Sequence, residues 1–101
     1  MQLQHRKYRL KPGVFDEFVA VWTEQVVPMR GEFGFSVVGA WASREASTFV
    51  WIVGHDGDFA AAEEAYYASP ERAAITPNPG DLIDHADVVM VDALASEAPR
   101  A

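Results

Sequence analysis

The sequence contains no cysteine, few basic residues and no long apolar run. The absence of cysteine excludes disulfides, a thiol nucleophile and thiolate-bound metal clusters. Only 8 lysines and arginines stand against 15 aspartates and glutamates, which gives a formal net charge of −7. A molecule of this charge repels phosphate backbones and anionic lipid surfaces. We therefore expect neither a nucleic acid nor a membrane as a partner.

Signals for export and for cofactor binding are also missing. No apolar stretch approaches the roughly 18 residues of a membrane span, and residues 1–6 lack the apolar core of a signal peptide. A cytoplasmic location is the expectation. The sequence shows no catalytic signature, metal-ligand constellation or nucleotide-binding loop, so we expect no cofactor, and the residues do not name a substrate.

Apolar residues are plentiful instead, since 50% of the chain is hydrophobic and 12% is aromatic. A chain of 101 residues forms one domain and buries about two-thirds of its unfolded surface in one modest core. The apolar content exceeds what one small core needs, so part of it is expected to meet a partner or a ligand. We expect the domain over residues 1–95 and a frayed tail over residues 96–101.

The order of the segments predicts β-α-β-β-α-β, the ferredoxin-like split βαβ unit of an α+β fold. Residues 3–11 are typical of a first strand, which ends before Pro12 because the residue preceding a proline is held away from the helical region. Apolar residues at helical spacing then predict a helix that Pro28 stops. The remaining elements are two strands at residues 35–41 and 48–55, a helix at residues 59–68 and a strand at residues 86–94.

The two middle strands carry apolar residues on both faces. In the first of them, alternation places Phe35 and Trp41 on one face and Val38 on the other. Two helices cover only one face of the sheet in such a unit. A second copy of the sheet is the simplest cover for the other face, and we therefore expect a homodimer.

Several short motifs together resemble the NIPSNAP family in its bacterial single-domain form. They lie at residues 6–13, 18–22 with 27–28, 34–35 with 39–41, 49–51 and 66–72. Their order and spacing carry the likeness, which covers residues 5–92. The resemblance implies a dimeric α/β barrel, a fold similar to that of cofactor-independent monooxygenases of antibiotic biosynthesis, haem-degrading enzymes and many members with no known activity. It leaves the chemistry open.

The candidate ligand-binding residues combine aromatic rings with arginines. Aromatic walls with few polar groups are the usual chemistry of pockets, although ordinary core packing uses the same side chains. The arginines could hold an anion, or the basic first strand could instead pair with acidic residues of the last strand, such as Asp84 and Asp87. The candidate set is Arg6, Tyr8, Trp41, Trp51, Tyr66, Tyr67 and Arg72.

His55 is a weak catalytic candidate at the end of a strand. Near pH 7 an imidazole can abstract a phenolic proton or ligate a haem iron, and the alternative is a histidine that caps a turn. The acidic cluster around His85 does not predict a metal site, because consecutive strand residues point to opposite faces.

Two functions remain open. The first is a binding protein for a small aromatic or anionic molecule, without catalysis. The second is a cofactor-independent monooxygenase, or a related isomerase or cyclase, that acts on an electron-rich aromatic substrate. In that mechanism His55 or an ordered water deprotonates a phenol while Arg6 or Arg72 holds the anion. We favour the first, and the sequence does not decide whether the chain is an enzyme.

Overall fold

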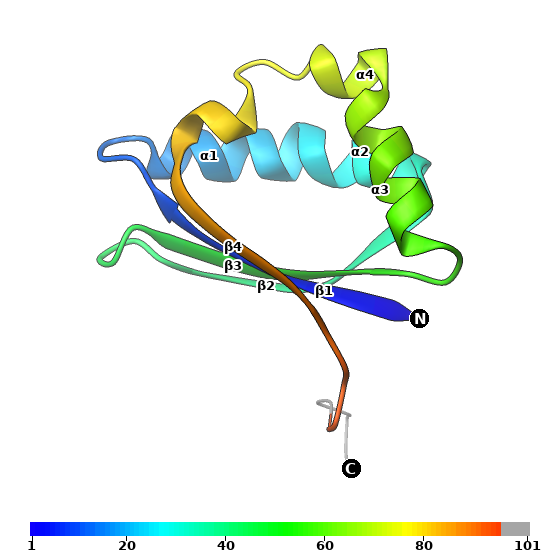
Figure 1. The fold of residues 1–101 in the computed structure, drawn as a ribbon. Coiled ribbons are helices and arrows are strands. Elements are labelled where there is room, and N and C mark those ends of the chain that lie inside the picture. Colours follow the sequence, from blue (N-terminus) through cyan, green and yellow to red (C-terminus); the bar gives the residue numbers. More distant parts are fainter. Residues whose placement is uncertain (96–101) are drawn as a thin grey trace.

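The computed structural model describes residues 1–95 and shows an antiparallel sheet with the helices on one face (Figure 1). The strands are β1 (Gln2–Leu10), β2 (Phe35–Ser43), β3 (Thr48–His55) and β4 (Ile83–Val91), in the spatial order β2-β3-β1-β4. The helical segments are α1 (Phe15–Val21), η1 (Trp22–Val26), α2 (Val27–Glu32), α3 (Phe59–Ala68), α4 (Pro70–Ala73) and η2 (Pro79–Leu82). The predicted α+β, ferredoxin-like arrangement is confirmed. The prediction for residues 96–101 lies outside the described residues.

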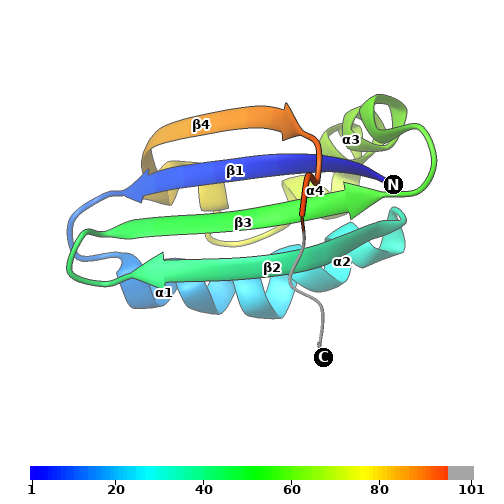
Figure 2. The same cartoon turned by 90° about the horizontal axis from the view of Figure 1, so that it is seen from below.

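Strand β1 occupies the middle of the sheet between β3 and β4, as Figure 2 shows from the open face. Its residues alternate, so that Gln4, Arg6, Tyr8 and Leu10 are buried on the helix side. The neighbouring strand supplies Phe49 and Trp51 to the same layer. A central strand of the sheet therefore carries polar side chains into the interior. None of the helices within residues 1–95 is long and apolar enough to cross a membrane.

The first helix is longer than predicted, because Pro28 does not end it. Segment α1 passes into the π-helix η1, which passes into α2, and the helix ends at Glu32. Pro28 lies in the first turn of α2, directly after the π-helical segment, where its missing N–H group removes one hydrogen bond of the continuous helix without ending it. The actual stop comes at Gly34, whose φ of 88° is costly for residues with a side chain.

A bulge in β2 overturns the predicted orientation of Trp41. The pairing with β3 skips Val38, so that Val37 and Gly39 oppose consecutive residues of β3. One extra residue reverses the alternation of everything that follows it. Trp41 therefore lies on the open face, opposite to the buried Phe35, and its ring covers Gly39, where an added Cβ would come within 2.6 Å of the indole.

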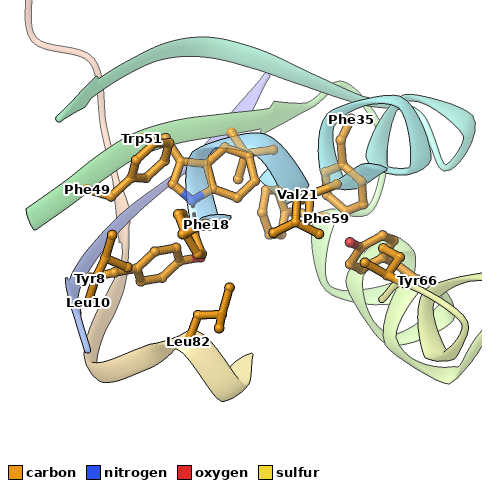
Figure 3. Packing of buried hydrophobic residues seen from close by; sticks show 13 residues of the cluster. Tyr8, Leu10, Phe18, Val21, Phe35, Phe49, Trp51, Phe59, Tyr66 and Leu82 are labelled. Carbon is orange, nitrogen blue, oxygen red and sulfur yellow. Dashed lines mark hydrogen bonds between the residues drawn. The ribbon is translucent and has the colours of Figure 1, made fainter. Parts of the chain in front are cut away.

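The core fills the space between the sheet and the helices (Figure 3). Phe49 lies at its centre, with ring centroids 5.0 Å from Phe18 and 4.9 Å from Trp22. Trp22 also contacts Trp51 at 5.4 Å, and these pairs meet edge to face, which is a favoured geometry for aromatic rings. The first helix is therefore attached to β3 mainly through aromatic contacts.

The open face of the sheet bears no helix (Figure 1), and one part of it is apolar, formed by Leu3, Val38, Trp41, Ile52 and Val91. Trp41 is 58% exposed there, Val38 is exposed on the same strand, and Val89 is exposed on β4 at the other edge of the sheet. Residues 92–95 leave β4 and pass below this face (Figure 2). A hollow of about 660 Å³ lies between them and the sheet.

Candidate ligand-binding site

A cavity of about 170 Å³ lies between the sheet and the helices. Six of the seven candidate residues line it: Arg6, Tyr8, Trp51, Tyr66, Tyr67 and Arg72. Figure 3 shows Tyr8 from β1 and Tyr66 from α3 reaching into this layer. Trp41 lies on the opposite face of the sheet, outside the cavity, because of the bulge in β2.

Local structure explains how α3 and α4 position their residues. Asp58 caps α3 by accepting a hydrogen bond from the Ala61 N–H group at 3.0 Å, as the acidic turn before it indicates. Ser69 caps α4 in the same way, through a 3.0 Å bond from the Arg72 N–H group. The Arg72 guanidinium then lies 5.8 Å and 5.4 Å from the ring centres of Tyr66 and Tyr67.

The π-helical turn aligns a row of residues on the first helix. Phe18, Trp22, Val26 and Arg30 are spaced by four residues, and all of them line the cavity. In a regular α-helix, 100° per residue would rotate Arg30 about 120° away from Phe18. A π turn accommodates one extra residue, which reduces this angle to about 20°. The π turn therefore brings Arg30 to the cavity.

Two arginines, a glutamate and two tyrosines form one hydrogen-bonded network. Arg6 donates to the hydroxyl oxygens of Tyr8 and Tyr67, the latter at 3.0 Å. Arg30 donates to Glu63 Oε1 at 2.9 Å and to the Tyr67 hydroxyl at 3.2 Å. Glu63 Oε1 also lies 3.7 Å from Arg6 Nη1. Two further bonds join the network, from Arg6 Nη1 to Gln4 Oε1 at 2.6 Å and from Trp51 Nε1 to the Tyr8 hydroxyl at 3.1 Å.

The network carries an excess of positive charge. The side chains of Arg6 and Arg30 are only 10% and 2% exposed, and they share one carboxylate, Glu63, which is 24% exposed. Arg72 adds a third guanidinium to the cavity wall. Burial lowers the pKa of Arg6, but Tyr8, Tyr67 and Glu63 together raise it by more, so that the pKa lies above its ordinary value. Both buried arginines are charged at neutral pH.

Tyr66 lies against Arg30, with the guanidinium 4.3 Å from its ring centre. Burial raises the pKa of Tyr66, and the charges of Arg30 and Arg72 oppose that shift without cancelling it. The phenol is therefore neutral at physiological pH. Its ring offers an apolar wall that also stabilises a cation over its face.

Two buried donors have no hydrogen-bond partner within residues 1–95, namely Trp22 Nε1 and Arg30 Nε. Both side chains line the cavity. Buried polar groups of native proteins are nearly always paired, so an unpaired donor beside a cavity calls for an explanation.

Arg30, Glu63 and Gln4 are not among the residues predicted to bind a ligand. Arg30 continues the four-residue spacing of Phe18, Trp22 and Val26, which was the available signal. Because the helix was predicted to end at Pro28, Arg30 was not assigned to it. Gln4 shares its strand face with Arg6 and Tyr8, so the alternation of the first strand was its available signal. Glu63 carried no local signal, because its partner Arg30 lies 33 residues away along the chain.

His55 lies outside the cavity and supports a turn. Its Nδ1 accepts a hydrogen bond from the Gly57 N–H group at 2.8 Å, so Nε2 carries the proton and donates to the Phe33 carbonyl at 3.1 Å. Nε2 also lies 2.8 Å from where a Cβ of Gly34 would be. Both ring nitrogens of His55 bond to the backbone, which matches the turn-capping alternative and directs neither of them into the cavity.

The charges between β1 and β4 are partly paired. Arg9 lies 3.3 Å from Asp84 on the exposed surface, as the cross-strand alternative predicts, and Lys7 is in register with Asp87. Arg6 alone of these basic residues is buried. Within the described part of the chain, no group of three or more histidine and acidic residues could hold a metal ion.

No protein-family model and no curated protein matches the sequence. Solved structures do match. An uncharacterized NIPSNAP domain protein from Burkholderia xenovorans has a TM-score of 0.78 at 21% identity, over 96% of this chain and 100% of that one. A NIPSNAP family protein of unknown function from Agrobacterium tumefaciens has a TM-score of 0.79 at 23% identity, over 90% of this chain and 86% of that one. The chain has the fold of these NIPSNAP proteins.

The NIPSNAP fold extends to proteins with other names. A putative antibiotic biosynthesis monooxygenase from Nitrosomonas europaea has a TM-score of 0.70 at 12% identity, over 94% of this chain and 100% of that one. The likeness to NIPSNAP proteins that the motifs predicted is thus confirmed in the structure. At these identities it establishes the fold, and activity has to be argued from the site.

Proposed function

We propose that this chain is a NIPSNAP-like protein that binds a small molecule in the cavity between the sheet and the helices, without catalysis. The observation that carries the proposal is the excess charge beside the cavity, where the buried Arg6 and Arg30 share the single carboxylate of Glu63. A buried charge that lacks a partner is costly. An anionic ligand, such as a carboxylate or a phenolate, supplies the missing charge, and the aromatic walls suit a ring.

The proposal includes a homodimer in which the open faces of two sheets meet. Trp41, Val38 and Ile52 make the part of this face over β2 and β3 apolar, and Trp41 and Val38 are exposed in the single chain. An apolar surface of this kind is typical of a protein interface. We also propose a cytoplasmic location, as expected from the sequence.

A cofactor-independent monooxygenase, or a related isomerase or cyclase, is the second candidate. It is favoured by the fold shared with a putative antibiotic biosynthesis monooxygenase and by the aromatic lining of the cavity. Such a reaction needs a base within reach of the substrate. His55 is outside the cavity, and Glu63 is engaged by both arginines. For this reason binding ranks above catalysis.

Arg72 provides the test of the proposed function. Its guanidinium makes one long side-chain hydrogen bond, to Asn78 Oδ1 at 3.5 Å, so its removal costs little stability. We expect a screen of aromatic acids and phenols to yield ligands that raise the thermal midpoint of the native chain. Arg72→Ala should keep the midpoint of the free protein and lose the rise caused by these ligands.

Arg9→Ala is the matched control, since it removes the same charge from the other face of the sheet. It should keep the ligand response. A screen in which no compound raises the midpoint contradicts the proposed function. A large loss of stability in Arg72→Ala with an intact ligand response would show that Arg72 stabilises the fold and does not bind the ligand.

A further inference from the structure

We propose that the cavity binds its ligand through an oxyanion head group, a carboxylate or a phenolate, which accepts hydrogen bonds from the hydroxyls of Tyr8 and Tyr67. This inference rests on the proposed function and adds the chemical class and the orientation of the ligand. The hydrogen-bond donors and acceptors around the cavity support it.

The Tyr8 hydroxyl has used its accepting capacity and retains its proton. It accepts hydrogen bonds from Arg6 Nε and from Trp51 Nε1. A hydroxyl has two acceptor lone pairs and one donor hydrogen. Both lone pairs are therefore occupied, and the O–H group of Tyr8 has no acceptor among the hydrogen bonds of residues 1–95.

The Tyr67 hydroxyl also accepts two hydrogen bonds and retains its own proton as a donor. It accepts from Arg6 Nη2 at 3.0 Å and from Arg30 Nη2 at 3.2 Å. Two guanidinium groups thus polarise this hydroxyl and strengthen it as a donor. Arg6 donates to the Tyr8 hydroxyl through Nε and to the Tyr67 hydroxyl through Nη2, and both nitrogens are bonded to Cζ. The two oxygens of one carboxylate can therefore accept hydrogen bonds from both O–H groups.

Apart from the Tyr66 hydroxyl, the rest of the polar side chains in the lining are donors. Arginine and tryptophan side chains only donate, and Arg30 Nε and Trp22 Nε1 are both without partners in the described residues. The side chains that line the cavity include no carboxylate and no amide. A neutral ligand group that brings its own N–H donor would therefore find one side-chain acceptor in the lining, the Tyr66 hydroxyl, among several donors, whereas an oxyanion accepts from these donors and balances the charge.

The size of the cavity limits the ligand to about one ring. An apolar cavity of about 150 Å³ is known to hold a benzene molecule, and this cavity measures about 170 Å³. The ring lies against Trp22 and Trp51, which line its wall. Tyr67 is 46% exposed and Trp51 is 1% exposed, so the cavity runs from a mouth at Tyr67 to a buried end at Trp51.

The test compares ligands of one shape on the full chain by calorimetric titration. The probes are benzoate, 4-nitrophenolate, benzamide and toluene. We expect at least one of the two anions to bind about ten-fold or more tightly than benzamide, the ratio expected for a charged hydrogen bond. The anion that binds more tightly identifies the head group.

Two variants assign the preference to the hydroxyls. Tyr67→Phe and Tyr8→Phe keep the rings and the arginines, and each should reduce the preference for the anion over benzamide by several-fold. Thr48→Val, which removes a hydroxyl far from the cavity, should leave the preference unchanged. Tyr67→Phe alone suffices if Tyr8→Phe fails to fold.

The outcomes separate this inference from the proposed function. Binding of benzamide or toluene as tight as that of both anions leaves the proposed function standing and overturns the inference. An anion preference that Tyr67→Phe does not change also overturns it. If none of the probes binds, the proposed function and the inference both fail.

Discussion

Arg30 and Glu63 form a 2.9 Å ion pair that joins α2 to α3 beside the cavity. The same Glu63 oxygen lies 3.7 Å from Arg6 Nη1 on β1. One carboxylate thus connects three elements that are far apart in the chain. Its position explains how two buried guanidinium groups are held next to each other despite their mutual repulsion.

Glu63→Gln tests this connection. The substitution preserves volume and removes the one carboxylate within residues 1–95 that lies near both arginines, so we expect a loss of about 3 kcal/mol, the low end of the cost of breaking a buried ion pair. The double variant Arg30→Met with Glu63→Leu should recover only part of it, because Arg6 stays buried without a carboxylate. Asp16→Asn breaks the exposed pair of Asp16 with Arg44 and should cost less than about 1 kcal/mol. Urea unfolding measures all three, and equal costs for the two carboxylates would contradict the assignment.

Trp22→Ala is expected to destabilise the chain by about 3 kcal/mol, the lower end of the cost of removing a core tryptophan, because Trp22 is only half buried. The substitution removes the contacts with Phe49 and Trp51 and enlarges the cavity. Trp22→Phe, which keeps a ring at this position, should retain more than half of that stability. A shift of the unfolding midpoint that corresponds to less than about 1 kcal/mol for Trp22→Ala would show that these contacts do not hold the helix.

Trp41→Glu tests the homodimer. Light scattering of the native chain should return twice the mass of 11.1 kDa, whereas the variant should return the mass of a monomer, because a carboxylate is costly in an apolar interface. Ala60→Glu adds the same charge on the exposed side of α3 and should leave the dimer intact. A folded native chain that runs as a monomer at micromolar concentration excludes the proposed assembly.

Tyr66→Phe tests the raised pKa of Tyr66. Because the folded state raises this pKa above its ordinary value of 10.0, folding holds the phenolic proton more tightly than the unfolded chain does. The resulting stability is present below the ordinary pKa and is lost as the pH rises through the raised value. The native chain should lose more free energy of unfolding on the alkaline side than Tyr66→Phe does. Parallel pH profiles would show that Tyr66 titrates normally.

Elements with strong local signals were predicted to the residue. The alternation of β3 gave Thr48–His55, and the Asp58 cap with its alanine-rich continuation gave Phe59–Ala68. Strand β4 was placed three residues too late, since its bounds depend on pairing with β1 and on a register shift at Arg9. Because β1 is distant from β4 in the sequence, this pairing leaves no local pattern around residues 83–91.

The candidate site was predicted where strand alternation decides the face. Arg6 and Tyr8 share one face of β1, and this placed them in one cavity with Trp51. Trp41 was misplaced because a bulge adds one residue to an otherwise regular period. Whether the assembled residues bind a ligand stays a prediction.

The π turn also determines how this helix should be aligned with others. A hydrogen bond from residue i to i+5 closes a turn that is one residue longer than an α turn, so the helix is equivalent to a regular one with a single inserted residue. The cavity residues from Phe18 to Arg30 are spaced by four, four and four residues. If one residue between Trp22 and Val26 were removed, the spacings would become four, three and four, which is the pattern of one face of a regular α-helix. Arg30 keeps its place at the cavity in both cases. Related chains one residue shorter here can therefore present the same arginine, and an alignment finds it only if it allows a gap inside a helix.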